Sequence, residues 1–129
     1  MRPLIFICAP LTPRDGDRNA AEEYLANCRE TFLISTDLIK LGFTIYCPAT
    51  DFPFFWVDRS FPVELVYQQD LGMIDHADAV YEYGRTYLSP NCKAELDRAK
   101  ARGLEILYSL GDAKRFIEQW KEEWDDDAG

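Results

Sequence analysis

Residues 89–103 read SPNCKAELDRAKARG, and this stretch decides the fold because it predicts a helix whose start and end are both marked. Ser89 is a favourable N-cap, and Pro90 suits the first helical position, where its missing N–H costs nothing. Gly103 is placed to close the helix as its C′ residue. Apolar, strand-like runs precede and follow the helix, so the segment predicts a βαβ unit with a right-handed crossover.

Glu95 is the chemically interesting residue of this helix. The residues spaced at i, i+4, i+7 and i+11 from Cys92 to Gly103 form the stripe that we expect to be buried, and Glu95 lies beside it. Its carboxylate can therefore point into a crevice at the edge of the sheet. Alternatively, it lies in solvent and pairs with Arg98 or Arg102, which on spacing alone is the commoner arrangement for a helix glutamate.

The whole chain alternates predicted strands and helices, with breakers such as Pro10, Gly42 and Pro48 between them. The expected strands are residues 3–9, 43–47, 77–81 and 104–108, and the expected helices are residues 19–41, 63–75, 90–102 and 112–124. This order predicts an α/β fold: a doubly wound, flavodoxin- or Rossmann-like parallel sheet of four to five strands in the order 2-1-3-4, with helices on both faces. Ligands of such sheets bind beyond the carboxyl ends of the strands, here at the switch point between the first and third strands.

Length and charge limit the domain count and the partners. A chain of 129 residues supports one domain, which we expect at residues 1–121, followed by an acidic tail at residues 122–129. The net charge of −9 argues against a nucleic-acid polymer as partner, whereas a mononucleotide needs only a few local donors. The N-terminal apolar run is too short for a signal peptide or a membrane span, so we expect a cytoplasmic protein without a membrane partner.

The cysteines and the histidine do not form a recognisable metal motif. The four cysteines include no CxxC pair, and the chain has one histidine, so we expect no metal site. Free thiols on apolar faces fit a reducing compartment, which agrees with the expected location.

A breaker-rich loop, residues 10–19, leaves the carboxyl end of the first expected strand and therefore faces the expected site. Its cations Arg14 and Arg18 can bind a phosphate or a carboxylate. They can equally pair with Asp15 and Asp17, and the sequence favours neither arrangement.

A second segment, residues 49–62, has no clear period and predicts a long irregular loop. Its aromatic residues are Phe52, Phe54, Phe55, Trp56 and Phe61. These rings can stack on a base, or they can form a hydrophobic plug or a subunit contact. Because so many apolar side chains are uncomfortable on a monomer surface, we expect a homodimer or a higher homo-oligomer.

Asp70 falls near the apolar stripe of the helix expected at residues 63–75. A carboxylate is costly in such a place unless it has a partner. The position therefore marks Asp70 as a candidate for the site.

Taken in order, the motifs of this chain resemble those of the nucleoside 2-deoxyribosyltransferase-like superfamily, over nearly the whole length. The residues that carry the resemblance are 5–10 (IFICAP), Asn19, Gly42, Pro48, Asp70, Leu71, 77–80 (ADAV), Ser89, Glu95, Ala99 and Gly103. The run LSPNCKAELDRAKARGLEILY, residues 88–108, is particularly similar to the small phage and bacterial branch of that superfamily.

The resemblance implies an activity and a set of site residues. The superfamily includes nucleoside 2-deoxyribosyltransferases and 2′-deoxynucleoside 5′-monophosphate N-glycosidases, in which a glutamate attacks the anomeric carbon, and Glu95 matches it. Asp70 matches an aspartate that assists at the base or sugar, and Ser89 matches a serine of the phosphate site. The further substrate-binding residues that we expect are Phe6, Ala9, Pro10, Arg14, Arg18, Asn19, Asp51, Phe54 and Asn91. No metal or organic cofactor is implied.

The implied function is cleavage or transfer at the N-glycosidic bond of a (deoxy)nucleoside or nucleoside 5′-monophosphate, through a glycosyl-enzyme on Glu95. The chain departs from the family at Phe6, where the transferases carry a tyrosine, and at residues 13–18 (PRDGDR), which replace a glycine-rich phosphate loop. Phe6 favours an alternative, a catalytically weak nucleotide-binding or sensing protein of the same fold. The combination of Asp70, Ser89 and Glu95 favours the enzyme, and a purely structural homo-oligomer is the third possibility.

Overall fold

The computed structural model describes residues 1–11, 20–84, 86 and 89–128, and its centre is a parallel sheet. The strands are β1 (Leu4–Cys8), β2 (Thr44–Tyr46), β3 (Ala79–Glu82) and β4 (Glu105–Leu107). They lie in the order β2-β1-β3-β4, and every neighbouring pair is parallel. The predicted α/β sheet with the order 2-1-3-4 is therefore confirmed.

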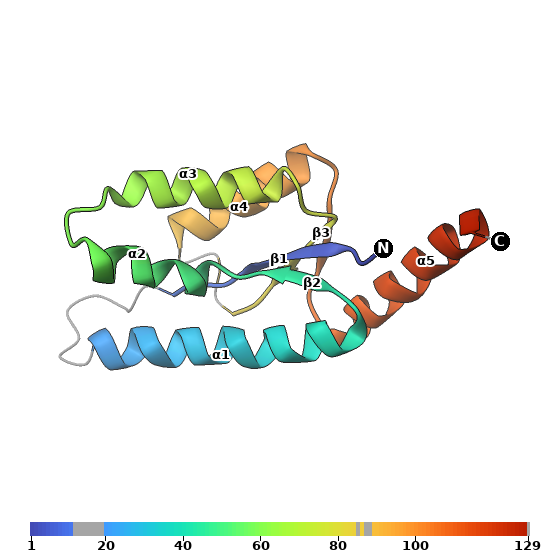
Figure 1. The fold of residues 1–129 in the computed structure, drawn as a ribbon, viewed down its shortest axis with the longest axis horizontal. Coiled ribbons are helices and arrows are strands. Elements are labelled where there is room, and N and C mark those ends of the chain that lie inside the picture. Colours follow the sequence, from blue (N-terminus) through green and yellow to red (C-terminus); the bar gives the residue numbers. More distant parts are fainter. Residues whose placement is uncertain (12–19, 85, 87–88, 129) are drawn as a thin grey trace.

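Helices cover both faces of this sheet (Figure 1). They are α1 (Ala20–Leu41), the 3₁₀ helix η1 (Pro48–Asp51), α2 (Phe52–Val57), α3 (Val63–Ile74), α4 (Pro90–Ala101) and α5 (Leu110–Ala128). One face carries α1 and α5, and the other carries α3 and α4, which lie side by side. None of the helices formed by the described residues is long and apolar enough to span a lipid bilayer.

The alternation of side chains along β1 creates two cores. Ile5 and Ile7 are fully buried in the core that includes Leu38 of α1 and Ile117 of α5. Their neighbours on the strand point to the other face and join a second core. That core consists of Phe6, Cys8, Ile74, Ala77, Val80, Cys92, Leu96 and Ala99. The continuous apolar run of the first strand thus reflects burial on both faces, as expected for a parallel sheet.

Both ends of α4 form as the sequence predicts. The Ser89 hydroxyl accepts a hydrogen bond from the Cys92 N–H at 3.2 Å, and Pro90 occupies the first turn. Gly103 adopts a φ of +72°, and the backbone N–H groups of Gly103 and Leu104 bond back to the last turn of the helix. This is the Schellman arrangement, in which a residue other than glycine would be strained. Gly103 itself is exposed, so its expected place in the buried stripe is wrong.

Two helical boundaries differ from the prediction. Residues 48–57 form η1 and α2 instead of part of an irregular loop, because a helix of six residues is too short to show a period. α5 begins at Leu110, where the Ser109 hydroxyl caps the Asp112 N–H at 3.1 Å, and not at Asp112. The helix then continues to Ala128, so the secondary structure does not break where the acidic tail was expected.

The outer surface of α1 carries apolar side chains. Cys28, Ser35 and Leu38 are buried against the sheet, but Leu25 and Phe32, which have a similar helical spacing, are exposed. Val57, at the end of α2, is also 90% exposed. Side chains of this kind are commonly covered by a partner subunit.

We therefore expect the protein to be at least a dimer in solution. Light scattering at micromolar concentration should give a mass at or above twice that of one chain. Replacing Val57 with glutamate should lower this mass if the aromatic segment of residues 52–61 forms the contact, because the charge would be buried without a partner. A wild-type mass equal to that of one chain would contradict the prediction.

Candidate active site

A pocket of about 160 Å³ opens beyond the carboxyl end of β1, between α1, α3 and the start of α4. Its lining residues are Ala9, Leu11, Tyr24, Pro48, Asp51, Val63, Val66, Tyr67, Asp70, Leu71, Ser89, Asn91, Cys92, Ala94 and Glu95. Six of the residues expected at the site are among them: Ala9, Asp51, Asp70, Ser89, Asn91 and Glu95. The pocket therefore lies at the edge of the sheet where the topology places a ligand.

Three other expected residues do not line this pocket. Phe6 is 0% exposed in the core, and its ring stacks on that of Tyr46 with 5.5 Å between centroids. Pro10 lies next to Gly84, and Phe54 is 42% exposed and stacks on Phe61. The remaining three, Arg14, Arg18 and Asn19, lie outside the described residues.

Glu95 is buried, with 7% of its surface exposed. Burial is the main reason that its pKa rises to about 9, and the neighbouring acidic groups Cys92 and Asp70 raise it further, while a hydrogen bond with Cys8 lowers it. The carboxyl group is thus held in a weakly polar environment at the inner wall of the pocket. The alternative that places Glu95 in solvent is wrong.

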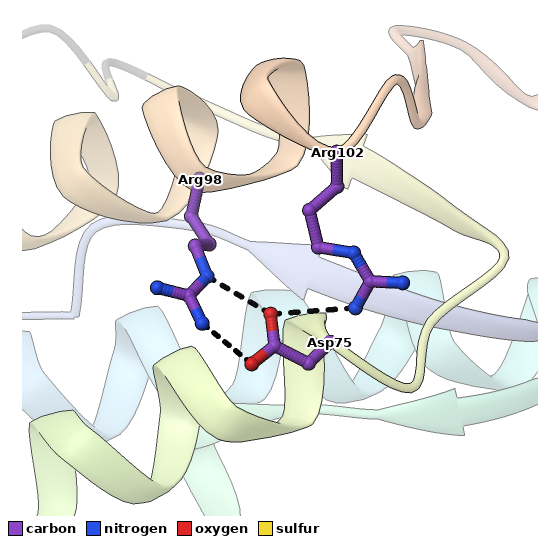
Figure 2. Close-up of polar contacts among 3 residues, drawn as sticks. All are labelled: Asp75, Arg98 and Arg102. Carbon is purple, nitrogen blue, oxygen red and sulfur yellow. Dashed lines mark hydrogen bonds and ion pairs between the residues drawn. The ribbon is translucent and has the colours of Figure 1, made fainter.

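The two arginines that were candidate partners of Glu95 bind Asp75 instead (Figure 2). Arg98 donates two hydrogen bonds to the Asp75 carboxylate, at 2.9 and 2.6 Å, and an Arg102 nitrogen lies 3.3 Å from the same group. The hydrogen bonds from Arg98 are the main reason that the pKa of Asp75 falls to about 2. This cluster links the end of α3 to α4 and leaves Glu95 without a counter-ion among the described residues.

Asp70 has the partner that its buried position requires. The Tyr46 hydroxyl donates a hydrogen bond of 2.8 Å to an Asp70 oxygen, and the side chain is 5% exposed. The pKa of Asp70 rises to about 8, first through burial and then through a hydrogen bond with Asp51, while the bond from Tyr46 lowers it. An Asp70 that keeps its proton at neutral pH is able to donate that proton to a ligand.

Asp51 completes a group of three carboxyl groups on the pocket wall. It is 5% exposed, and both its side chain and its charge raise the pKa of Asp70. Asp51 Oδ2 is buried without a hydrogen-bond partner among the described residues. Such an atom is available to accept a hydrogen bond from a ligand.

Sequence reasoning missed Tyr46. It pairs in register with Phe6 across β1 and β2, so the two rings stack and the Tyr46 hydroxyl reaches the carboxyl groups. The signal was present in the sequence, since Tyr46 is the last residue but one of the strand expected at residues 43–47 and thus lies near the edge where ligands bind. The hydroxyl bonds Asp70, and at 3.3 Å also Asp51.

Two thiols lie beside Glu95. One ligand atom from each of Cys8, Cys92 and Glu95 lies within 4.8 Å of the other two, and all three residues are buried. All four cysteines of the chain are buried and free, as expected.

Comparison with known proteins adds no relative: no protein-family model matches the chain, and a search of curated proteins found no similar sequence. The chemistry of the pocket and the motifs of the sequence therefore carry the functional argument.

Proposed function

We propose that the protein cleaves or transfers at the N-glycosidic bond of a (deoxy)nucleoside or nucleoside 5′-monophosphate, with Glu95 as nucleophile and Asp70 as acid. One observation supports this most strongly. Two buried carboxyl groups from different helices, α4 and α3, face the same pocket, and neither has a cationic partner among the described residues. Paired carboxyl groups of this kind are used to break glycosidic bonds.

The reaction would proceed in two steps. Glu95 attacks the anomeric carbon as the carbon–nitrogen bond breaks, the bonding electrons leave with the base, and Asp70 gives that base a proton. In the second step, water attacks the anomeric carbon and passes a proton to Asp70. The bond between this carbon and Glu95 breaks, which releases the free sugar and restores the Glu95 carboxylate. A second base in place of water gives transfer. No step requires a metal or an organic cofactor.

The raised pKa of about 8 suits Asp70 to the role of general acid, since most Asp70 side chains are protonated at neutral pH. Glu95, with a pKa of about 9, must first release its proton to solvent, so the reaction starts from the fraction of the protein in which this group is ionised. The positive charge that then develops on the sugar stabilises the ionised carboxylate, because opposite charges attract.

A panel assay tests the proposal. Purified protein is incubated with nucleosides and nucleotides of each common base, in ribose and deoxyribose forms, and free base is measured by chromatography. Release of free base, or exchange with a second base, supports the proposal. Absence of both activities across the panel would contradict it.

The alternative, a nucleotide-binding or sensing protein with little turnover, is favoured by the surroundings of Phe6. The side chain at this position has no hydroxyl, and the neighbouring Tyr46 hydroxyl bonds Asp70 and not Glu95. Ligand binding by calorimetry without release of base would support this second candidate.

We further predict that a nucleoside 5′-monophosphate binds better than its nucleoside. Ser89 caps α4 at the pocket, and the positive end of the helix dipole favours an anion there. Arg14 and Arg18 can add charge-assisted bonds. The negative net charge of the protein opposes this at long range, but salt screens it beyond about 8 Å.

Titration calorimetry on a Glu95→Gln variant, which does not consume the ligand, measures this difference. The monophosphate should bind several-fold more tightly, and Arg18→Ala should reduce the advantage. Arg98→Ala is the matched control, because Arg98 binds Asp75 away from the pocket lining. Equal affinities that do not change in Arg18→Ala would mean that the ligand is a free nucleoside.

A further inference from the structure

Cys8, Cys92 and Glu95 form a compact buried cluster with three potential metal ligands. Cys8 ends β1 and is 0% exposed, whereas Cys92 lies in the first turn of α4 with 2% exposed. Glu95 follows Cys92 by one turn of the same helix, so the two side chains share a face. The fold thus brings one strand end and one helix face together, and each ligand atom lies within 4.8 Å of the other two.

These distances are close to those of a tetrahedral zinc site. Zinc binds thiolate sulfur at about 2.3 Å and carboxylate oxygen at about 2.0 to 2.2 Å, so ligand atoms around it lie about 3.5 to 3.8 Å apart. The distances between the ligand atoms would have to shorten by about 1.0 to 1.3 Å at most. Two sulfur ligands favour zinc over calcium or magnesium, which take oxygen ligands.

The surroundings favour a cation. Asp51 and Asp70 line the same pocket as Cys92 and Glu95. Among the described residues of the pocket lining there is no lysine or arginine. A divalent cation bound there would have carboxyl groups around it and no cationic side chain against it, and its own charge would be the largest in the site.

The pocket gives a zinc ion access to these three ligands. Cys92 and Glu95 line the pocket, and Cys8 lies behind them, where its thiol donates a long hydrogen bond of 3.6 Å to the Cys92 carbonyl. Three protein ligands at the pocket floor would leave the fourth tetrahedral position facing the cavity. That is the arrangement of zinc sites that exchange a water or a ligand.

We propose that Cys8, Cys92 and Glu95 bind one zinc ion at the floor of the pocket, with the fourth position open to water or a small ligand. Binding converts both thiols to thiolates, and it releases their two protons and the Glu95 proton to solvent. The site does not depend on the proposed glycosidic activity. Because the metal would occupy the carboxylate of Glu95, zinc should inhibit that activity where it is present.

Cobalt titration of the reduced, metal-free protein tests the site. Co²⁺ bound by two thiolates in a tetrahedral site gives intense near-ultraviolet charge-transfer bands, and we expect one equivalent to saturate them and Zn²⁺ to displace it. Because loss of a partner outside the ligand shell already costs roughly 10- to 100-fold in metal affinity, Cys8→Ser and Cys92→Ser should weaken binding by at least about 100-fold. Glu95→Gln should weaken it by at least about 10-fold, with the thiolate bands retained. Cys28→Ser and Cys47→Ser are matched controls, because both thiols are buried in the other core.

X-ray absorption on the zinc-loaded wild-type protein gives a second readout that needs no core substitution. Two sulfur neighbours at about 2.3 Å with oxygen neighbours near 2.0 Å would support the site. A shell of oxygen and nitrogen alone would overturn the proposal. So would the absence of cobalt bands at micromolar protein, or bands that survive in Cys8→Ser and Cys92→Ser and disappear in Cys47→Ser.

Discussion

Replacing Glu95 with glutamine is expected to abolish the release of free base while the protein stays folded. Glutamine fills nearly the same volume in a side chain that is 7% exposed, so the pocket should keep its shape. The amide cannot form a glycosyl ester with the sugar. Loss of a covalent nucleophile should reduce turnover by about 10³-fold or more, which corresponds to about 4 kcal/mol of transition-state stabilisation. Chromatography of the free base measures the effect.

Glu118→Gln is the matched control, because Glu118 is an exposed glutamate on α5, away from the pocket lining. It should retain full turnover. Both variants are assayed with a chelator present, so that inhibition by zinc cannot be confused with loss of the nucleophile. Turnover of the Glu95→Gln protein at the wild-type rate would exclude Glu95 as the nucleophile.

Much of the fold was predictable because local signals and global topology agree. Pro10 and Pro48 follow the first two strands, Gly42 adopts a φ of +116° after α1, and Ser89 and Gly103 mark the ends of α4. Each of these residues has a backbone or capping preference that does not depend on distant contacts. Strand order followed from the alternation of elements.

The buried and exposed faces of α1 could not be predicted in the same way. Leu25, Phe32 and Ile39 are spaced like core residues, yet they are 58%, 41% and 46% exposed, while Thr31 is 2% exposed. Thr31 satisfies its hydroxyl within the helix, by a hydrogen bond of 2.7 Å to the Cys28 carbonyl, so it can be buried at little cost. Periodicity identifies an amphipathic helix, but it does not say which of two apolar faces meets the sheet.

The site depended on contacts that sequence spacing does not contain. Asp75, from the end of α3, binds Arg98 and Arg102, so neither arginine is a partner for the buried Glu95. Those contacts form only after α3 and α4 pack together. For the same reason the proximity of Cys8 to Cys92, residues 84 positions apart, could not be seen before the sheet was assembled.

A second large effect is expected in the pH dependence of folding. The folded-state pKa values of Asp70 and Glu95 rise from ordinary values of 3.8 and 4.5 to about 8 and about 9. At pH values between the ordinary and the raised pKa of each group, the folded protein binds more protons than the unfolded chain. The free energy of unfolding therefore falls as pH rises. Each group contributes about 1.4 kcal/mol per pH unit, hence at most about 4 kcal/mol between pH 5 and pH 8. Because the two groups interact, their combined effect should be less than the sum.

Urea unfolding at pH 5 and pH 8 measures this directly. The wild-type protein should be several kcal/mol less stable at pH 8, whereas Glu95→Gln and Asp70→Asn should each flatten the dependence, because an amide does not ionise. Glu95→Gln should therefore be more stable than the wild type at pH 8, although it is inactive. Asp75→Asn is the control: the pKa of Asp75 is lowered to about 2, so its contribution is complete at both pH values and its loss should leave the slope unchanged. Stability that is constant or rises from pH 5 to pH 8 in the wild-type protein would mean that Asp70 and Glu95 are ionised in the folded state, and the acid assigned to Asp70 would then be lost.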